Sequence, residues 1–419
     1  MRIAVVGGGS TYTPELADGI ARLPATADVE ELSLIDPAED RLGVIGPFAA
    51  RLFRRHGHPA RVTWTSDLDR GLDGADVVLI QLRVGGQNAR ISDETFPLEC
   101  GCVGQETTGA GGLAKALRTV PVILEVAQRA ARRAREGAWI IDFTNPVGIV
   151  TRALLDAGHR AIGLCNVAIG FQRRFAGLLG VDPDAVELDH VGLNHLTWER
   201  AVHVDGLDLL PKLLDENVTA LAAEVGLPPR VLLALGCVPS YYLRYFYAHD
   251  EVVEEERGAA PRGQHVADIE ARLLALYADP TRDEKPDLLM QRGGAYYSEA
   301  AVGLIGSLRA TVPSPHVANV RNRGTLPFLD DDSVIEVSCA VDSAGPVPTS
   351  VAAVAPELAG LIAHVDAYER LALDAALRGG RERVYRALLA HPLVGQHTLA
   401  ECLTDRLLAA NAPSLGWEP

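Results

Sequence analysis

The chain has 419 residues, 48% of them hydrophobic and 22% charged, as expected for one large or two moderate globular domains. A formal net charge of −16 argues against nucleic acid or an anionic membrane as a partner. No apolar run approaches the roughly 20 residues that span a bilayer, and the six cysteines are too sparse for a disulfide scaffold, so we expect a cytoplasmic protein in a reducing compartment.

The first third of the chain alternates apolar runs of strand length with helical patterns. The clearest helical pattern covers residues 112–135, where Leu113, Leu117, Val120 and Leu124 recur at helical spacing. Strands that alternate with helices predict an α/β fold, in which a doubly wound parallel sheet of the Rossmann type carries helices on both faces. The predicted strands are residues 2–6, 32–36, 61–65, 76–82, 138–144 and 161–165.

The segment VVGGGSTYTPEL joins the first predicted strand to the first helix. Gly7 and Gly9 match the first two glycines of the GxGxxG pattern, but Tyr12 stands at the third. Asp36 closes the next strand, where its carboxylate can accept hydrogen bonds from an unphosphorylated ribose, which favours NAD over NADP. The alternative is a tight turn in an unrelated doubly wound domain. The candidate NAD contacts are Gly7, Gly8, Gly9, Ser10, Thr11 and Asp36.

Two further strand ends carry polar side chains. Asn145-Pro146 follows the strand IIDFT, and Cys165-Asn166 follows the strand at 161–165. Ligands of open α/β sheets bind at the carboxyl ends of the strands. A buried cysteine is more often a small hydrophobic residue than a reactive thiol, so position alone does not assign Cys165 a role.

The pattern changes after about residue 185. A strand, a loop and a second strand come first, then a mainly helical stretch to about residue 310, strands within 316–340 and helices within 355–411. We predict a Rossmann domain over residues 1–185 and a second, α+β domain for substrate, metal and subunit contacts over residues 186–419.

His195 lies in VGLNHLTW, between the two strands that open the second part. Histidine and cysteine together can hold a divalent ion, with the thiol ionised. Two protein ligands are fewer than the three or four typical of zinc sites, so substrate or water would complete the coordination. A structural histidine at a strand end is the more common case.

An aromatic segment, CVPSYYLRYFY, covers residues 237–247. Most such clusters pack in a core, but Tyr242 or Tyr245 could act as a base if a neighbouring cation favoured the phenolate. The arginines that lie in loops beside glycines are better placed than surface arginines to bind a phosphate or sugar hydroxyls. These loop arginines are Arg83, Arg90, Arg262, Arg292, Arg321 and Arg323.

Taken in order, these segments resemble glycoside hydrolase family 4, the NAD- and manganese-dependent glycosidases. The branch that the sequence is most similar to is that of the 6-phospho-β-glucosidases, because Asn166 follows the cysteine where the phospho-α-glucosidases carry aspartate. Ala168 departs from the proline usual in this branch. The matching stretches are GGGSTYTPEL, LRVGG with ARISDE, GQETTGAGG, FTNPVGI, CNVAIG, GLNHLTW, PSYYLRYFY, RGGAYYS and VRNRG.

The resemblance implies a role for each matching residue. Tyr242 matches the family's catalytic base, although Tyr241 beside it leaves that assignment open by one position. The resemblance also implies a lactate/malate dehydrogenase-like fold, a phosphorylated β-glucoside as the small-molecule substrate, and a homodimer or homotetramer. The implied Mn²⁺ ligands are Cys165 and His195, and the implied substrate contacts are Arg90, Asn145, Asn166 and Arg262.

The implied reaction does not use the usual pair of carboxylates, since this NAD-dependent family is an exception among glycosidases. NAD⁺ oxidises C3 of the sugar, the C2 proton becomes acidic and is removed, and the glycosidic bond breaks by elimination. Mn²⁺ acts as the Lewis acid. The resemblance leaves open the choice between gluco and galacto substrates and which arginine binds a 6-phosphate.

The main alternative is an NAD-dependent 2-hydroxy-acid dehydrogenase of the lactate/malate type. His195 would then transfer the proton and Arg90 would bind the substrate carboxylate. This alternative leaves Cys165 and the tyrosine cluster without a function. It predicts steady net NADH formation on lactate or malate, whereas the glycosidase shows no net turnover of NAD.

Overall fold

The fold was obtained as a computed structural model, which describes residues 1–23, 28–294 and 296–418. Residue 295, within RGGAYYS, lies outside them. The described strands form one mixed sheet, in which the parallel half has the order β3-β2-β1-β4-β5-β6. This 3-2-1-4-5-6 order is that of the Rossmann fold, as predicted. The parallel strands are β1 (Arg2–Val6), β2 (Glu31–Ile35), β3 (Arg61–Thr65), β4 (Val77–Ile80), β5 (Trp139–Asp142) and β6 (Ala161–Gly163).

Both faces of the inner strands of this parallel half are buried, whereas the edge strand β3 is partly exposed. In β1, Ile3 and Val5 point into one hydrophobic cluster, whereas Ala4 and Val6 point into a second cluster on the opposite face. Successive side chains of a strand alternate between faces, so a strand covered on both sides needs an uninterrupted apolar run. The helices that follow these strands are α1 (Thr13–Ala21), α2 (Glu39–Arg55), α3 (Leu68–Leu72), α4 (Gly86–Glu99), α5 (Gly109–Arg133), α6 (Val147–Asp156) and α7 (Val167–Leu179).

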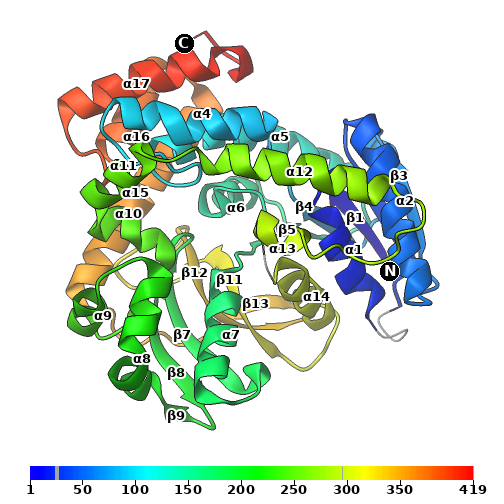
Figure 1. Cartoon of the computed structure of the whole chain (residues 1–419), viewed down its shortest axis with the longest axis horizontal. Helices are drawn as coiled ribbons and strands as arrows, with labels where there is room; N and C mark the ends of the chain where they lie inside the picture. Colours follow the sequence, from blue (N-terminus) through cyan, green and yellow to red (C-terminus); the bar gives the residue numbers. More distant parts are fainter. Residues whose placement is uncertain (24–27, 295, 419) are drawn as a thin grey trace.

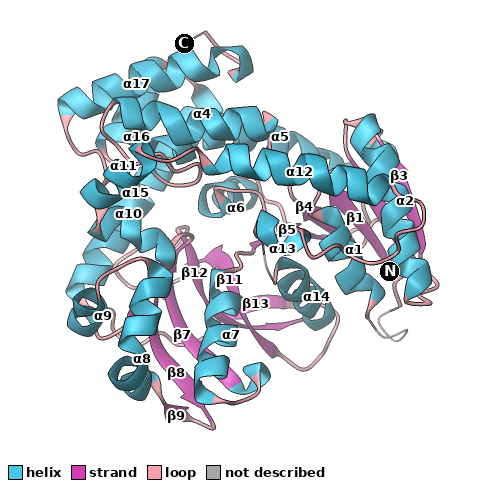
Figure 2. Ribbon diagram, in the orientation of Figure 1, coloured by secondary structure: helices cyan, strands magenta, loops and turns pink. Residues whose placement is uncertain are grey.

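The sheet continues without a break into an antiparallel half. Strand β11 joins the two halves, because all of it pairs with β12 and Asn319 also pairs with Gly163 of β6. Figure 2 shows this half in the lower part of the view, with α7 and α8 beside its strands. The predicted boundary at 185/186 falls just before this half and stays a prediction. The antiparallel strands are β7 (Val186–Leu193), β8 (Leu196–Val204), β9 (Leu207–Asp208), β10 (Val238–Pro239), β11 (Ser314–Arg321), β12 (Val334–Asp342) and β13 (Gly345–Pro348).

Helices from both parts of the chain pack together. Figure 1 shows α4, α5 and α12 side by side, with the C-terminal helices next to them. The later helices are α8 (Leu210–Val225), α9 (Pro229–Leu235), α10 (Arg244–Tyr247), α11 (His249–Arg257), α12 (Arg262–Ala278), α13 (Leu289–Arg292), α14 (Tyr297–Ser307), α15 (Pro356–Arg378), α16 (Arg381–Leu389) and α17 (His397–Asn411).

No single described helix is long and apolar enough to cross a membrane. Helices α8 and α9 would be long and apolar enough if they formed one continuous helix, but they are bent at 116° to each other.

A disulfide joins Cys100, at the end of α4, to Cys402 in α17, across 302 positions of sequence. This pair departs from the expectation of reduced cysteines. The other four, Cys102, Cys165, Cys237 and Cys339, are free and buried. The disulfide connects the C-terminal helix to the helix that carries Arg90.

We expect the change Cys402→Ser to lower the free energy of unfolding by about 2–4 kcal/mol, because the lost cross-link constrains the unfolded chain. For a chain of this size the midpoint of thermal unfolding should fall by about 2–5 °C. Calorimetry with and without dithiothreitol measures this. Reductant should lower the midpoint of the unmodified protein to that of the variant, and should leave the variant unchanged. If reductant leaves the unfolding midpoint of the unmodified protein unchanged, the prediction is wrong.

Candidate active site

Two adjoining cavities lie at the carboxyl ends of the parallel strands, where ligands of such sheets bind. The larger, of about 980 Å³, borders the glycine segment after β1 and is named here the glycine-turn cavity. The smaller, of about 300 Å³, borders Tyr241 and Tyr242 and is named the tyrosine cavity. A ligand in one cavity can reach a ligand in the other, because the two cavities share part of their lining. The shared lining residues are Ser10, Gln81, Leu82, Arg83 and Arg292.

The glycine segment is tied closely to the neighbouring strands. The N–H groups of Gly7 and Gly8 both donate to the carbonyl of Ile35 at 2.9 Å. A Cβ on Gly7, which has φ +90°, would lie 2.5 Å from the carbonyl oxygen of Gln81. A Cβ on Gly8 would lie 2.8 Å from the backbone nitrogen of Ile35. These two positions therefore require glycine for packing alone.

Asp36 lies at the rim of the glycine-turn cavity, as its position after β2 predicts. Its Oδ2 accepts from the N–H of Gly9 at 3.0 Å, and its Oδ1 accepts from the N–H of Ala38 at 3.0 Å. The carboxylate is thus held in place at the mouth of the cavity. Of the six predicted NAD contacts, Gly7, Gly9, Ser10 and Asp36 are among the described residues that line this cavity. Gly8 and Thr11 are not among them.

Thr11 faces the second part of the chain instead. Its hydroxyl donates to Glu270 of α12 at 3.0 Å and accepts from Nε of Arg292 at 2.7 Å. Its carbonyl accepts from the hydroxyl of Tyr277 at 3.0 Å. Thr11 therefore anchors α12 and α13, the short helix that ends at Arg292 and that the sequence predicts as a loop, to the glycine segment. Contacts of Gly8 and Thr11 with NAD stay predictions.

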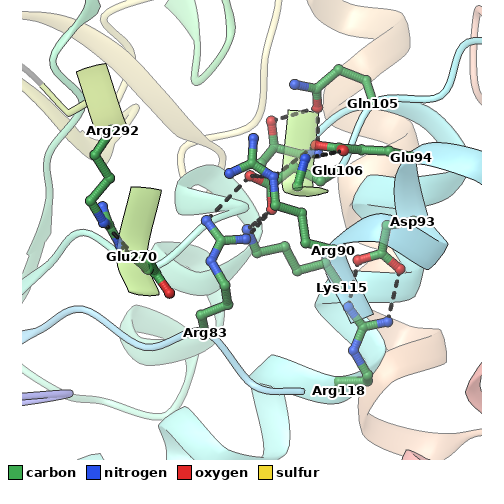
Figure 3. Close-up of polar contacts among 12 residues, drawn as sticks. Arg83, Arg90, Asp93, Glu94, Gln105, Glu106, Lys115, Arg118, Glu270 and Arg292 are labelled. Atoms are coloured by element: carbon green, nitrogen blue, oxygen red, sulfur yellow. Dashed lines mark hydrogen bonds and ion pairs between the residues drawn. The ribbon is translucent and has the colours of Figure 1, made fainter. Parts of the chain in front are cut away.

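A concentration of positive charge lines the tyrosine cavity in an otherwise acidic protein. Glu106, which is buried, accepts from Nζ of Lys115 at 2.7 Å and from both Nη atoms of Arg83, and it forms an ion pair with Arg90, whose Nε lies 3.2 Å from its Oε1. Figure 3 shows these side chains around Glu106. Burial would raise the pKa of Glu106, but the charges of Arg83, Lys115 and Arg90 hold that pKa well below its usual value. The cationic residues that line the cavity are Arg83, Arg90, Lys115, Arg262 and Arg292.

Two of these cations lie close enough to repel each other. Burial lowers the pKa of Arg262, and the charge of Arg90 lowers it further. Arg90 is held by Glu94, whose Oε1 lies 2.7 Å from its Nε, and Arg262 donates to the carbonyl of Gln291 at 2.9 Å. An anion bound beside both guanidinium groups would relieve the repulsion, so this part of the cavity suits a phosphate.

Asn145 and Asn166 both line the tyrosine cavity from the ends of β5 and β6. The Oδ1 atom of Asn145 is buried and has no hydrogen-bond partner among the described residues. An unpaired buried acceptor costs roughly 1–3 kcal/mol, and a ligand hydroxyl could offset that cost. Asn166 is the residue immediately before α7.

Cys165 lies between β6 and α7 and is 6% exposed. Burial raises the pKa of its thiol, and the negative charge of Glu336 raises it further. The backbone N–H groups of Val167 and Asn166 and the side chain of Asn194 act in the opposite direction, because they hydrogen-bond to the sulfur. The N-terminus of α7 therefore faces the sulfur with the donors that a thiolate needs.

His195 occupies the two-residue turn between β7 and β8, where Leu193 pairs with Leu196. Its φ of +64° is uncommon for a residue other than glycine and costs of order 1–3 kcal/mol. Burial lowers the pKa of His195 to about 3, so the imidazole is neutral. A neutral imidazole has one nitrogen free to bind a metal.

Tyr242 connects the two predicted metal ligands. Its ring stacks on the imidazole of His195, with centroids 3.5 Å apart and planes at 10°. Burial raises its pKa well above the usual value, and the charges of Tyr241 and Cys165 raise it further. Cys165 and His195 thus both act on the same tyrosine at the edge of the cavity. The described residues contain no group of three or more His, Cys, Asp and Glu side chains that could hold a metal. Metal binding by Cys165 and His195 stays a prediction.

A buried acidic network lies beside both side chains. His190, fully buried, contacts Glu199 at 2.6 Å through Nδ1 and Glu336 at 3.1 Å through Nε2. Glu336 also accepts from Asn194 at 2.9 Å and from Asn319 at 2.7 Å. Although burial lowers the pKa of His190, the two carboxylates outweigh it and raise that pKa to about 10. Two carboxylates against one imidazolium give a negative environment, which fits a cation beside Cys165 and His195.

Sequence reasoning assigned no role to three residues that the structure brings to the site. Glu106 stands within the quoted GQETTGAGG, but a lone glutamate in a loop carries no specific signal. Lys115 lies within the predicted helix, where a lysine is almost always solvated. Glu336 is an ordinary position of a strand until its partners are known. Their long-range contacts appear only in the folded chain.

Comparison with known proteins extends these observations. A model of the N-terminal part of family 4 glycosyl hydrolases matches residues 2–181, and a model of the family's C-terminal domain matches residues 190–394. A probable 6-phospho-beta-glucosidase of Bacillus subtilis (strain 168) is 37% identical over 98% of this chain and 96% of its own length.

Solved structures show the same likeness. The 6-phospho-beta glucosidase of Thermotoga maritima, solved with manganese, NAD⁺ and glucose-6-phosphate, superposes with a TM-score of 0.93 and 33% identity over 99% of both chains. Malate dehydrogenase of Salinibacter ruber superposes with a TM-score of 0.55 and 16% identity, over 90% of this chain and 98% of its own. The second likeness is one of fold alone and confirms the Rossmann-like α/β fold.

Proposed function

The chain belongs to family 4 of the glycosyl hydrolases, and from this we propose that it is a 6-phospho-β-glucosidase that uses NAD and Mn²⁺. One observation carries the proposal. The tyrosine cavity, with its cationic lining, opens directly onto the glycine-turn cavity. A phosphorylated sugar in the first would therefore lie beside a dinucleotide in the second.

The cationic lining supports a phosphorylated substrate. Arg90 and Arg262 are the proposed ligands of the phosphate, because an anion between them relieves their mutual repulsion. Asn145 presents an unpaired buried oxygen to a sugar hydroxyl, and Asn166 lines the same cavity. Such groups fix the orientation of the sugar ring. Relatives named 6-phospho-beta-glucosidase support a β-glucoside over an α-glucoside.

The cofactor sites follow from the same geometry. Gly7, Gly9, Ser10 and Asp36 would hold NAD, and the anchored carboxylate of Asp36 suits the hydroxyls of an unphosphorylated ribose. Cys165 and His195 would hold a divalent cation. When bound, NAD accepts and returns hydride and the cation acts as a Lewis acid toward the sugar oxygens.

The chain's own proton acceptor is Tyr242. It removes the proton from C2 of the sugar as a phenolate, which its buried position disfavours until a cation lies nearby. The stacking on His195 holds the ring at the edge of the cavity. The hydroxyls of Tyr241 and Tyr242 are hydrogen-bonded to each other, so Tyr241 can orient Tyr242.

The proposal extends to the organisation of the protein. We propose a Rossmann domain over residues 1–185 and an α+β domain over residues 186–419, assembled into a homodimer or homotetramer. A cytoplasmic location is proposed because Cys165 must stay a free thiol to bind a metal.

The proposed function predicts that 4-nitrophenol is released from 4-nitrophenyl β-glucoside 6-phosphate only with both NAD⁺ and Mn²⁺, in the presence of reductant. Without the phosphate, kcat/KM should fall about 100-fold or more, since two charge-assisted hydrogen bonds are lost. Absorbance at 400 nm follows release, and absorbance at 340 nm should show no net NADH. Steady NADH formation on lactate or malate, without release, would support the dehydrogenase instead.

A further inference from the structure

A threonine outside the proposed catalytic set contacts a ring nitrogen of His195. The Oγ1 atom of Thr107 lies 3.0 Å from Nδ1 of the imidazole. Thr107 precedes α5, whereas His195 stands in the turn between β7 and β8. The contact therefore joins the two parts of the chain directly behind the proposed metal ligand.

The direction of this hydrogen bond follows from a second neighbour. Oγ1 of Thr107 also lies 2.9 Å from Oε1 of Gln105, and the backbone N–H of Thr107 donates to the same Oε1. An atom that accepts from a backbone N–H is the amide oxygen, and an amide oxygen cannot donate. The single hydroxyl hydrogen of Thr107 is thus committed to Gln105, and its oxygen is left to accept from the imidazole.

The consequence for His195 is a fixed tautomer. Nδ1 must carry the hydrogen that Thr107 accepts, and a neutral imidazole carries only one. Nε2 then has a free lone pair, which is the state that a metal ion requires. Metal-binding histidines commonly donate their other N–H to an oxygen in this way.

Stacking on Tyr242 does not determine whether Nδ1 or a ring carbon of His195 faces Thr107. Two parallel rings 3.5 Å apart fix the plane of the imidazole, but a half-turn about the Cβ–Cγ bond exchanges Nδ1 with a ring carbon and preserves the stacking. The half-turned ring would present C–H to Thr107 and lose the hydrogen bond. Only the polar contact distinguishes the two orientations.

We propose that Thr107, held by Gln105, is a positioning residue that orients His195 for a divalent cation by fixing its Nδ1–H tautomer. This inference rests on the proposed function, because it takes His195 as a metal ligand. Loss of such a contact typically weakens metal binding 10–100-fold.

The test is a titration with Mn²⁺ alone, followed by electron paramagnetic resonance of the free ion. Thr107→Val keeps the shape of the side chain but cannot accept a hydrogen bond, so the Kd for Mn²⁺ should rise about 10–100-fold. Thr107→Ser keeps the hydroxyl and should restore the Kd to within about threefold of the original. A matched control is Thr108→Val, since Oγ1 of Thr108 is buried with no partner among the described residues; its Kd should not change.

Affinity for NAD⁺ and the midpoint of thermal unfolding show whether each variant is folded, and Thr107→Ala replaces Thr107→Val if the latter is not. The proposal is overturned if the valine and alanine variants bind Mn²⁺ as the original does. It is also overturned if the serine variant loses as much affinity as the valine variant, because packing would then be the cause. Failure of this kind leaves the release assay unaffected, whereas a protein that hydrolyses no phosphorylated glucoside fails the proposed function itself.

Discussion

Tyr242→Phe should lower kcat for 4-nitrophenyl β-glucoside 6-phosphate by about 10²–10⁴-fold, the range expected when a general base is removed. The substitution deletes only the hydroxyl, so the ring still stacks on His195. Binding of substrate and metal should therefore change little. Steady-state kinetics and the Mn²⁺ titration together separate a loss of chemistry from a loss of binding.

Tyr241→Phe is the matched control, because Tyr241 lines the same cavity with its ring centroid 4.4 Å from that of Tyr242. We expect kcat to fall by less than about tenfold in this variant, since an orienting partner contributes less than the base. A larger effect at position 241 than at 242 would move the role of base to Tyr241. Exchange of the C2 proton with deuterated solvent offers a second measurement, and it should stop in the true base variant.

Cys165→Ala should weaken Mn²⁺ binding by more than about 100-fold, because loss of a direct ligand exceeds the 10–100-fold typical of a contact one step removed. Activity should fall with it. The expectation follows from the donors around the sulfur, which prepare a thiolate at the N-terminus of α7. Affinity for NAD⁺ should be retained, since Cys165 does not line the glycine-turn cavity.

Cys237→Ala provides the comparison, because Cys237 is another free, buried thiol, just before β10. It should leave Mn²⁺ binding unchanged. Full alkylation of the free thiols should abolish activity in the unmodified protein. Activity that survives complete alkylation would show that the sulfur of Cys165 is not a ligand.

Hydropathy predicted every strand of the parallel half. Strands β1 and β3 have the predicted bounds, whereas β2, β4, β5 and β6 end before the predicted residue. The strand predicted over 161–165 is β6, Ala161–Gly163, so Cys165 lies beyond the sheet. Strand ends depend on hydrogen bonds to neighbouring strands, which a local pattern does not contain. The predicted helix over 112–135 is α5, Gly109–Arg133, which begins and ends a few residues earlier than predicted.

The polar residues of the site divide in the same way. Asn145 and Asn166 could be placed from the sequence, because strand ends share one edge of a parallel sheet. Lys115 and Glu106 could not, since Glu106 pairs both with Lys115 of α5 and with Arg83, which follows β4, and no local pattern records these contacts. The pairing of Cys100 with Cys402 depends on α4 and α17 lying side by side, which no local pattern records.

The disulfide and the free thiol of Cys165 respond to the surroundings in opposite ways. An oxidising medium preserves the bond between α4 and α17 but attacks the sulfur that is proposed to bind a metal, whereas a strongly reducing one protects that sulfur and opens the bond. Shelf life of the purified enzyme should therefore peak at an intermediate ratio of reduced to oxidised glutathione and decline toward either extreme.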